Sequence, residues 1–299
     1  MNTTSTDQQS VVSGQRAVVR PFYWSVWREL WENRSIYIAP LIVAAVILFG
    51  SFLGSFHLPG LRRKALLLDP AHQRAAIERP YDIAAIMLIF TAVIIGVFYC
   101  LDALHGERRD RSILFWKSLP VSDLTTVLSK ATIPLVVLPI VIFATIVLTQ
   151  FGMLLLSTAA LLTSGLAGST WANFNLFQQS LILLYGLIAI ALWHAPIYGW
   201  LLLVSGWARR ATFLWALLPL IAISFFEKIT FNTAHFASML KDRLIGFASA
   251  AFAFHTHSVD SAAITPGTYL STPDLWIGLV FAAIFLAAAV RLRRYRGPI

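Results

Sequence analysis

The 299-residue chain has few charged side chains: Asp, Glu, Lys and Arg make up 12% of it, whereas hydrophobic residues make up 58%. A soluble domain usually has about a quarter of its residues charged. A chain this apolar cannot cover its surface with polar groups in water. The composition therefore predicts an all-α integral membrane protein.

Several signatures of chemistry are missing from the chain. The one cysteine, Cys100, excludes an intrachain disulfide and a cysteine-based metal site. The sequence has no G-x-x-x-x-G-K-[ST] phosphate loop, no H-E-x-x-H zinc helix and no G-x-S-x-G nucleophile turn. His255 and His257 could together bind a metal ion, but a solvated loop without metal is the simpler interpretation. We expect no catalytic residue, metal or cofactor on this chain.

Six apolar segments approach the roughly 20 residues that a membrane span needs. The predicted spans are residues 36–56, 83–101, 131–156, 181–204, 211–226 and 275–290. They contain no Asp, Glu, Lys or Arg, and His194 is their one His. His194 is interpreted as a hydrogen-bonded packing residue, with a proton relay as the alternative. The absence of buried charge argues against an ion-coupled transporter and an intramembrane enzyme.

The net charge of +9 would suggest nucleic acid as a partner of a soluble protein. In a membrane protein, Lys and Arg gather in the cytoplasmic segments, and no nucleic-acid partner is expected here. Placing both termini in the cytoplasm puts 15 of the 23 Lys and Arg residues inside. The first outer loop, with Arg62, Arg63 and Lys64, disagrees with this rule.

Two segments precede the first span. Residues 1–20 are polar and are predicted to be a disordered lead. Residues 21–34 predict an amphipathic helix that lies at the membrane surface, with Trp24, Trp27 and Trp31 on its apolar face as anchors. Contact with a cytoplasmic partner is a second role open to this helix. Residues 35–299 then form a single six-span transmembrane domain.

The loop between the second and third spans, residues 102–130, contains the stretch GERRDRSILFWKSLPVSD (106–123). Gly106 and Pro120 bracket a short helix, because the residue before a proline avoids helical geometry. Ser122 is expected to cap a second helix that leads into the third span. Aromatic and Arg side chains are typical of binding hot spots, so the short helix is expected to dock in a groove of a partner. Lying flat on the bilayer is the alternative.

This loop resembles the first cytoplasmic loop of ABC-2 type transporter permeases. The residues that carry the resemblance are Glu107, Arg108, Arg109, Leu114, Lys117, Ser118, Leu119, Pro120, Val121, Ser122, Leu128 and Lys130. The amphipathic helix before the first span, the six-span count and a long outer segment between the last two spans agree with the same family. The sequence departs from it at Asp110-Arg111-Ser112, where the family usually has a Gly after the charged cluster.

The resemblance implies that the loop helix is a coupling helix, which docks into a cleft of a separate ATPase subunit. The implied contact residues are Glu107, Arg108, Arg109, Asp110, Phe115, Trp116, Lys117 and Pro120. Phe115 and Trp116 would fill the cleft, and the charges of Glu107 and Arg109 would form an exposed rim around it. Residues 227–274 would form re-entrant helices on the outer side.

The family also implies the partners and the place of the protein. Two copies of the ATPase would bind ATP and magnesium, and a second permease copy or homologue would complete a dimer in the lipid of a bacterial inner membrane. The expected function is the permease subunit of an ATP-driven exporter. The alternative is a scaffold or assembly factor that binds a partner other than an ATPase through residues 102–130.

Overall fold

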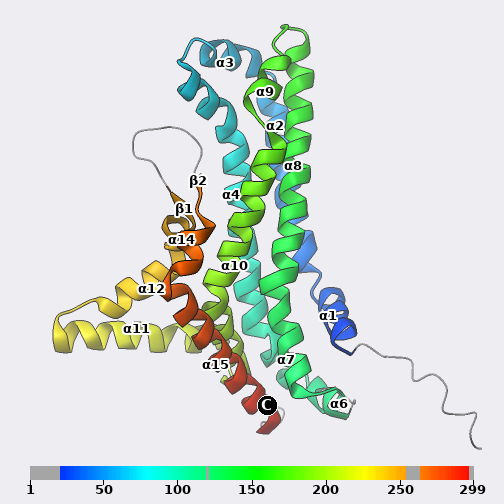
Figure 1. Cartoon of the computed structure of the whole chain (residues 1–299). Coiled ribbons are helices and arrows are strands. Elements are labelled where there is room, and N and C mark those ends of the chain that lie inside the picture. Colours follow the sequence, from blue (N-terminus) through cyan, green and yellow to red (C-terminus); the bar gives the residue numbers. More distant parts are fainter. Residues whose placement is uncertain (1–20, 119–120, 254–262, 296–299) are drawn as a thin grey trace, which may run out of the picture.

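The computed structural model describes residues 21–118, 121–253 and 263–295, and almost all of them are helical (Figure 1). The predicted lead 1–20, Pro120, His255 and His257 lie outside these residues. So do the side chains of Trp116 and Lys117. The one strand pair is short, with two residues each in β1 (Phe252–Ala253) and β2 (Ala263–Ile264).

The longer helices form the body of the molecule. They are α2 (Ser35–Ser55), α4 (Pro70–Ala103), α7 (Asp123–Thr132), α8 (Leu138–Leu162), α10 (Leu176–Trp207), α11 (Thr212–Phe231) and α15 (Pro273–Tyr295). A π-helical turn, η1 (Ile133–Val137), joins α7 to α8. The shorter helices are α1 (Pro21–Glu32), α3 (Leu58–Ala65), α5 (His105–Arg109), α6 (Ser112–Ser118), α9 (Gly168–Asn173), α12 (His235–Ile245), α13 (Phe247–Ala251) and α14 (Pro266–Ser271).

Within the described residues, six helices are long and apolar enough to cross a membrane. They coincide with the six predicted spans, so the prediction of a multi-pass helical membrane protein is confirmed. The predicted start of the second span at residue 83 marks only part of its helix, since α4 begins at Pro70. Residues 70–82 are polar but rich in good helix formers, so the helix continues where the apolar pattern stops. At 34 residues, α4 is about 50 Å long and exceeds the hydrocarbon core of a bilayer.

The helices α2, α4, α8 and α10 run alongside one another, and α15 packs along α10 (Figure 1). Their shared core is apolar, with Leu88, Ile146 and Leu202 fully buried. The outward faces are equally apolar: the side chains of Phe90 and Leu148 are 65% and 68% exposed. Large apolar side chains inside and outside are what a bundle surrounded by lipid requires.

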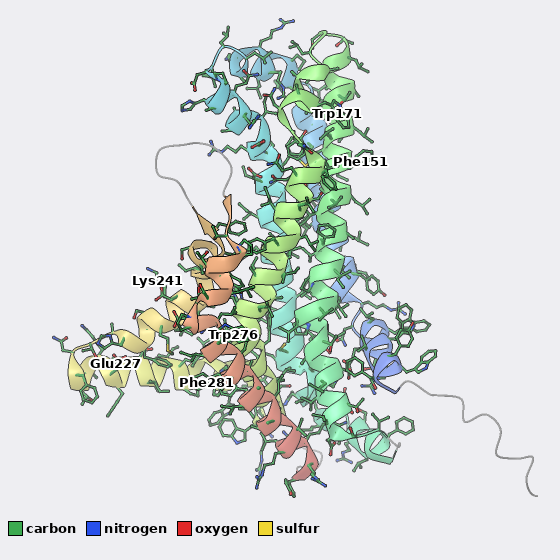
Figure 2. The ribbon with its side chains drawn as sticks, in the orientation of Figure 1. Phe151, Trp171, Glu227, Lys241, Trp276 and Phe281 are labelled. Carbon is green, nitrogen blue, oxygen red and sulfur yellow. The ribbon has the colours of Figure 1, made fainter. Side chains whose placement is uncertain are left out.

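Helix α11 leaves the bundle at a steep angle, and α12 lies beside it as the second half of a lateral arm (Figure 1). Glu227 near the end of α11 accepts hydrogen bonds from the backbone N–H groups of His235 and Phe236, at 2.7 and 2.8 Å, and so caps α12. Figure 2 shows Glu227 and Lys241 on this arm, and Trp276 and Phe281 on α15 beside it.

The arm returns to the middle of α10. The ring nitrogens of His194 lie 2.9 Å from the carbonyl oxygen of Ile190 and 3.1 Å from that of Leu244 in α12. The indole N–H of Trp193 donates to the carbonyl oxygen of Asp242. His194 is buried between backbone carbonyls, which agrees with a packing role.

Two ends of the bundle can be distinguished. Helices α1, α5, α6 and α7 and the end of α15 lie at one end, here called the α6 end, and α3 and α9 lie at the other (Figure 1). The first and last helices of the described chain therefore meet at the same end, as an even number of spans requires.

Candidate functional site

The loop 102–130 forms three short helices at the α6 end. The prediction of one short helix between Gly106 and Pro120 is wrong: a turn at Asp110 and Arg111 separates α5 from α6, and Gly106 lies inside α5. The predicted cap of the next helix is confirmed, because the Ser122 hydroxyl accepts a hydrogen bond from the backbone N–H of Thr125 at 3.1 Å, at the start of α7. The chain thus presents α6 between two separately fixed helices.

Helix α6 has one buried and two exposed apolar side chains in its described part. Ile113 is 1% exposed and fixes the helix to the bundle. Leu114 and Phe115 are 59% and 60% exposed. Phe115 is one of the two aromatic side chains expected to meet a partner, and the side chain of the other, Trp116, lies outside the described residues. Whether this surface meets a protein or the bilayer stays a prediction.

The prediction that Glu107 belongs to an exposed rim is wrong. Glu107 and Arg108 are 9% and 5% exposed, whereas the side chains of Arg109 and Asp110 are exposed and pair with each other at 3.0 Å. The short helix α5 turns Glu107 and Arg108 into the bundle and leaves Arg109 outside. Counter-charges distant in the sequence compensate Glu107, which makes its burial tolerable.

Glu107 joins a cluster of three cations and three carboxylates, here called the ion-pair cluster, in which Arg28 and Asp123 are partly exposed and the other four side chains are buried. Its members are Arg28, Glu29, Glu107, Asp123, Lys130 and Arg293. The Lys130 ammonium lies 2.8 Å from Glu29 and 3.2 Å from Glu107. Arg293 reaches Glu107 at 3.2 Å and also pairs with Asp123. The formal charges of these six residues balance, Glu107 lies at the centre, and the half-exposed Glu32 also pairs with Arg28 at the edge, at 3.6 Å.

The ion-pair cluster connects four helices that are distant in the sequence, namely α1, α5, α7 and α15. Helix α4 joins through the Tyr99 hydroxyl, which donates to Glu29 at 2.9 Å. Burial alone would raise the pKa of Glu29, but the charges and hydrogen bonds of Lys130 and Arg28 outweigh burial and lower that pKa below its ordinary value. Glu29 is therefore a carboxylate at neutral pH.

A second set of contacts fixes α5 to the end of α10. The Arg108 guanidinium donates to the carbonyl oxygen of Gly206 at 2.8 Å and to that of Ala208 at 3.3 Å. The Ser205 hydroxyl accepts from the backbone N–H groups of Leu104 and His105, at 2.9 Å each. A cation at the carbonyl end of a helix satisfies unpaired acceptors and complements the helix dipole.

The turn between α5 and α6 contains an Arg in the left-handed conformation. Arg111 has a φ angle of 57°, in the left-handed region. This region favours glycine, because glycine has no Cβ. The position lies in the Asp110-Arg111-Ser112 stretch, where the sequence departs from the glycine usual in ABC-2 permeases. Local backbone strain is thus stored beside α6.

Arg111→Gly is expected to stabilise the protein by about 0.5–1 kcal/mol. Removing Cβ relieves about 1–2 kcal/mol of left-handed strain, and the greater freedom of the unfolded chain offsets part of this. Reaction of the buried Cys100 thiol with a dye during heating measures the change. Asp110→Gly is the control, since Asp110 has φ of −86° and gains nothing from glycine. A melting temperature that falls in Arg111→Gly would show that the turn is unstrained.

In comparisons with known proteins, no protein-family model, curated protein or solved structure matches the chain. The resemblance to ABC-2 permeases therefore stays a prediction, which rests on the residues of loop 102–130 and on the architecture.

Sequence reasoning missed most of the ion-pair cluster. It named Glu107 as a rim residue and Lys130 as part of a motif, and it did not connect Glu29 or Arg293 with them. The partners lie 101 residues apart for Glu29 and Lys130, and 186 apart for Glu107 and Arg293. One sequence signal was available: Glu29, Lys130 and Arg293 are charged residues next to apolar spans. A charged side chain is too costly to bury without a partner, so these residues could have been expected to pair.

Proposed function

We propose that the chain is the permease subunit of an ATP-driven exporter of the ABC-2 type, and that a separate ATPase subunit docks on α6. The observation that carries the proposal is the placement of α6. It presents Leu114 and Phe115 outward, and along the chain it lies between α5 and α7, whose Glu107 and Lys130 pair with each other in the ion-pair cluster. A helix in this position could be displaced by a bound ATPase and could transmit that displacement to the bundle.

The buried contacts supply the route for such a movement. A displacement of α6 moves α5 and α7, and these two helices cannot move apart without separating buried charges, which is costly. Glu107 passes the movement to Arg293 of α15, and Lys130 passes it to Glu29 of α1. Arg108 connects α5 with the end of α10. Opening and closing of the bundle would then follow the nucleotide state of the partner.

Two copies of the permease are proposed because the resemblance to ABC-2 permeases implies a dimer, and the hollow found between α4, α8 and α10 is small. A hollow of about 20 Å³ lies between α4, α8 and α10, lined by residues that include Ala92, Pro134 and Tyr198. A cavity of this size holds about one water molecule. A substrate path would accordingly form between copies, and the substrate would leave at the α3 end.

The proposal is tested by purifying the tagged chain from its own cells in mild detergent. We expect a copurifying subunit with a phosphate loop and ATP hydrolysis that vanadate inhibits, because this chain has no such loop. The chain purified alone is expected to hydrolyse no ATP. Copurification of a partner without a phosphate loop, and no hydrolysis, would instead support the scaffold alternative.

The proposed topology places the α6 end in the cytoplasm of a bacterium, with both termini. A cysteine at Asp110 is then expected to be protected from a membrane-impermeant thiol reagent in intact cells, and one at Leu67 to be labelled. Both positions are exposed in the structure, and the native Cys100 is fully buried and will not react. The opposite labelling pattern would invert the topology and move the ATPase site outside the cell.

A further inference from the structure

The outward face of α1 carries a groove that the proposed function does not use. Its lining comes from one helix, and its volume is about 390 Å³. The lining residues are Trp24, Trp27, Arg28, Trp31 and Glu32. Trp27 and Arg28 lie three and four residues after Trp24, and Trp31 and Glu32 lie four residues after Trp27 and Arg28, so that the side chains are neighbours on one surface.

The indole rings of the groove are available to a ligand. Trp24, Trp27 and Trp31 are 60%, 44% and 69% exposed. Tyr23 stacks against Trp27, with ring centroids 6.3 Å apart and planes 13° from parallel, and holds that ring in place. The faces of Trp rings carry negative potential and attract organic cations more strongly than other aromatic rings do.

The groove contains one carboxylate, Glu32, and one guanidinium, Arg28, and the carboxylate is the more exposed of the two. Arg28 points its guanidinium inward, to Glu29 at 2.7 Å and to Glu107 at 3.5 Å. The Glu32 side chain is 52% exposed, and its ion pair with Arg28 is long, at 3.6 Å. Rings with a carboxylate at their edge form a surface that complements a small ammonium group.

The position of α1 identifies where such an ammonium would come from. Glu32, the last residue of α1, is three residues from Ser35, the first residue of the candidate span α2. A helix that leads directly into a span lies at the level of the lipid headgroups.

We propose that the groove of α1 binds the ammonium of a phospholipid headgroup of the ethanolamine class. The three indole rings enclose the ammonium, and Glu32 pairs with it. The site fixes α1 to the lipid on its outer face while Glu29 fixes α1 to the bundle on its inner face. The inference does not depend on whether the chain is a permease.

The test uses the full chain purified in detergent. Short-chain phosphatidylethanolamine and phosphatidylglycerol are titrated separately, and bound lipid is counted by native mass spectrometry. We expect saturable binding of the ethanolamine lipid and weaker binding of the glycerol lipid, which has no ammonium. Trp27→Leu keeps apolar bulk but removes the ring face, and Glu32→Gln removes the charge. Each is expected to weaken ethanolamine-lipid binding roughly two- to fivefold.

The controls separate this site from general anchoring. Trp171→Leu changes an exposed indole at the α3 end and is expected to leave binding unchanged. Trp27→Phe keeps an aromatic face and is expected to fall between wild type and Trp27→Leu, which provides a milder variant if Trp27→Leu folds poorly. Equal binding of both lipids, or no effect of Trp27→Leu and Glu32→Gln, would show that the tryptophans are apolar anchors only. Free phosphoethanolamine that competes as well as the lipid would overturn the lipid as the source.

Discussion

Replacing Glu107 with Gln is expected to lower the free energy of unfolding by about 3 kcal/mol or more, the usual consequence of removing one partner from a buried ion pair. The ion-pair cluster would then hold three cations against two carboxylates. Lys130 and Arg293 are each 3% exposed by side chain, so water cannot replace the lost charge. The melting temperature should fall by roughly 10 °C, measured by the reactivity of the buried Cys100.

A matched control is available on the same helix. Arg109 is exposed and pairs with Asp110 and Asp102, and Arg109→Gln is expected to change stability by less than about 1 kcal/mol. The double variant Glu107→Gln, Arg293→Gln restores charge balance and should cost less than the sum of the two single changes. Melting of Glu107→Gln within a degree of wild type would show that the cluster is hydrated and does not connect the helices.

The fold could be predicted from the sequence to the extent that lipid dictates it. Apolar runs of span length predicted the number of candidate membrane spans, because a bilayer requires backbone groups to be satisfied within each helix. The apolar runs did not predict helical segments that continue into polar sequence. The first part of α4, from Pro70 to Asp82, is such a segment, with good helix formers but no apolar stripe. The steep angle between α11 and the bundle was not predicted either, because composition shows how apolar a helix is and not in which direction it runs.

The candidate site was predictable in its local parts and not in its long-range parts. Ser122 as a cap follows from neighbouring residues. The single helix predicted between Gly106 and Pro120 does not form, because the left-handed turn at Arg111 divides that stretch into α5 and α6. The burial of Glu107 depends on Arg293, which the fold brings across the whole chain. A charged residue in a loop normally stays in water, so the sequence favoured an exposed rim. Only the packing of α1, α7 and α15 around α5 makes the buried arrangement stable.

The exposed apolar face of α6 leads to the second large expected effect. The double change Phe115→Ala, Trp116→Ala is expected to weaken binding of the proposed ATPase at least about thirtyfold. Truncation of aromatic hot-spot residues costs about 2 kcal/mol or more, and about 1.4 kcal/mol corresponds to a tenfold change in affinity. Phe115 is 60% exposed, so its removal leaves the bundle without a cavity. The affinity is measured by titrating the purified ATPase onto immobilised permease, and the melting temperature should stay near wild type.

Two comparison variants test whether the effect belongs to α6. Phe98→Ala removes a phenylalanine of similar exposure, 63%, from the lipid-facing side of α4 and is expected to leave ATPase binding unchanged. Arg109→Glu reverses an exposed charge beside α6 and is expected to cost about 1 kcal/mol at most. If the double variant binds the ATPase as tightly as wild type, α6 lies on the bilayer and the ATPase docks elsewhere. The ion-pair cluster would then stabilise the α6 end without transmitting force, because the helix it holds would receive none.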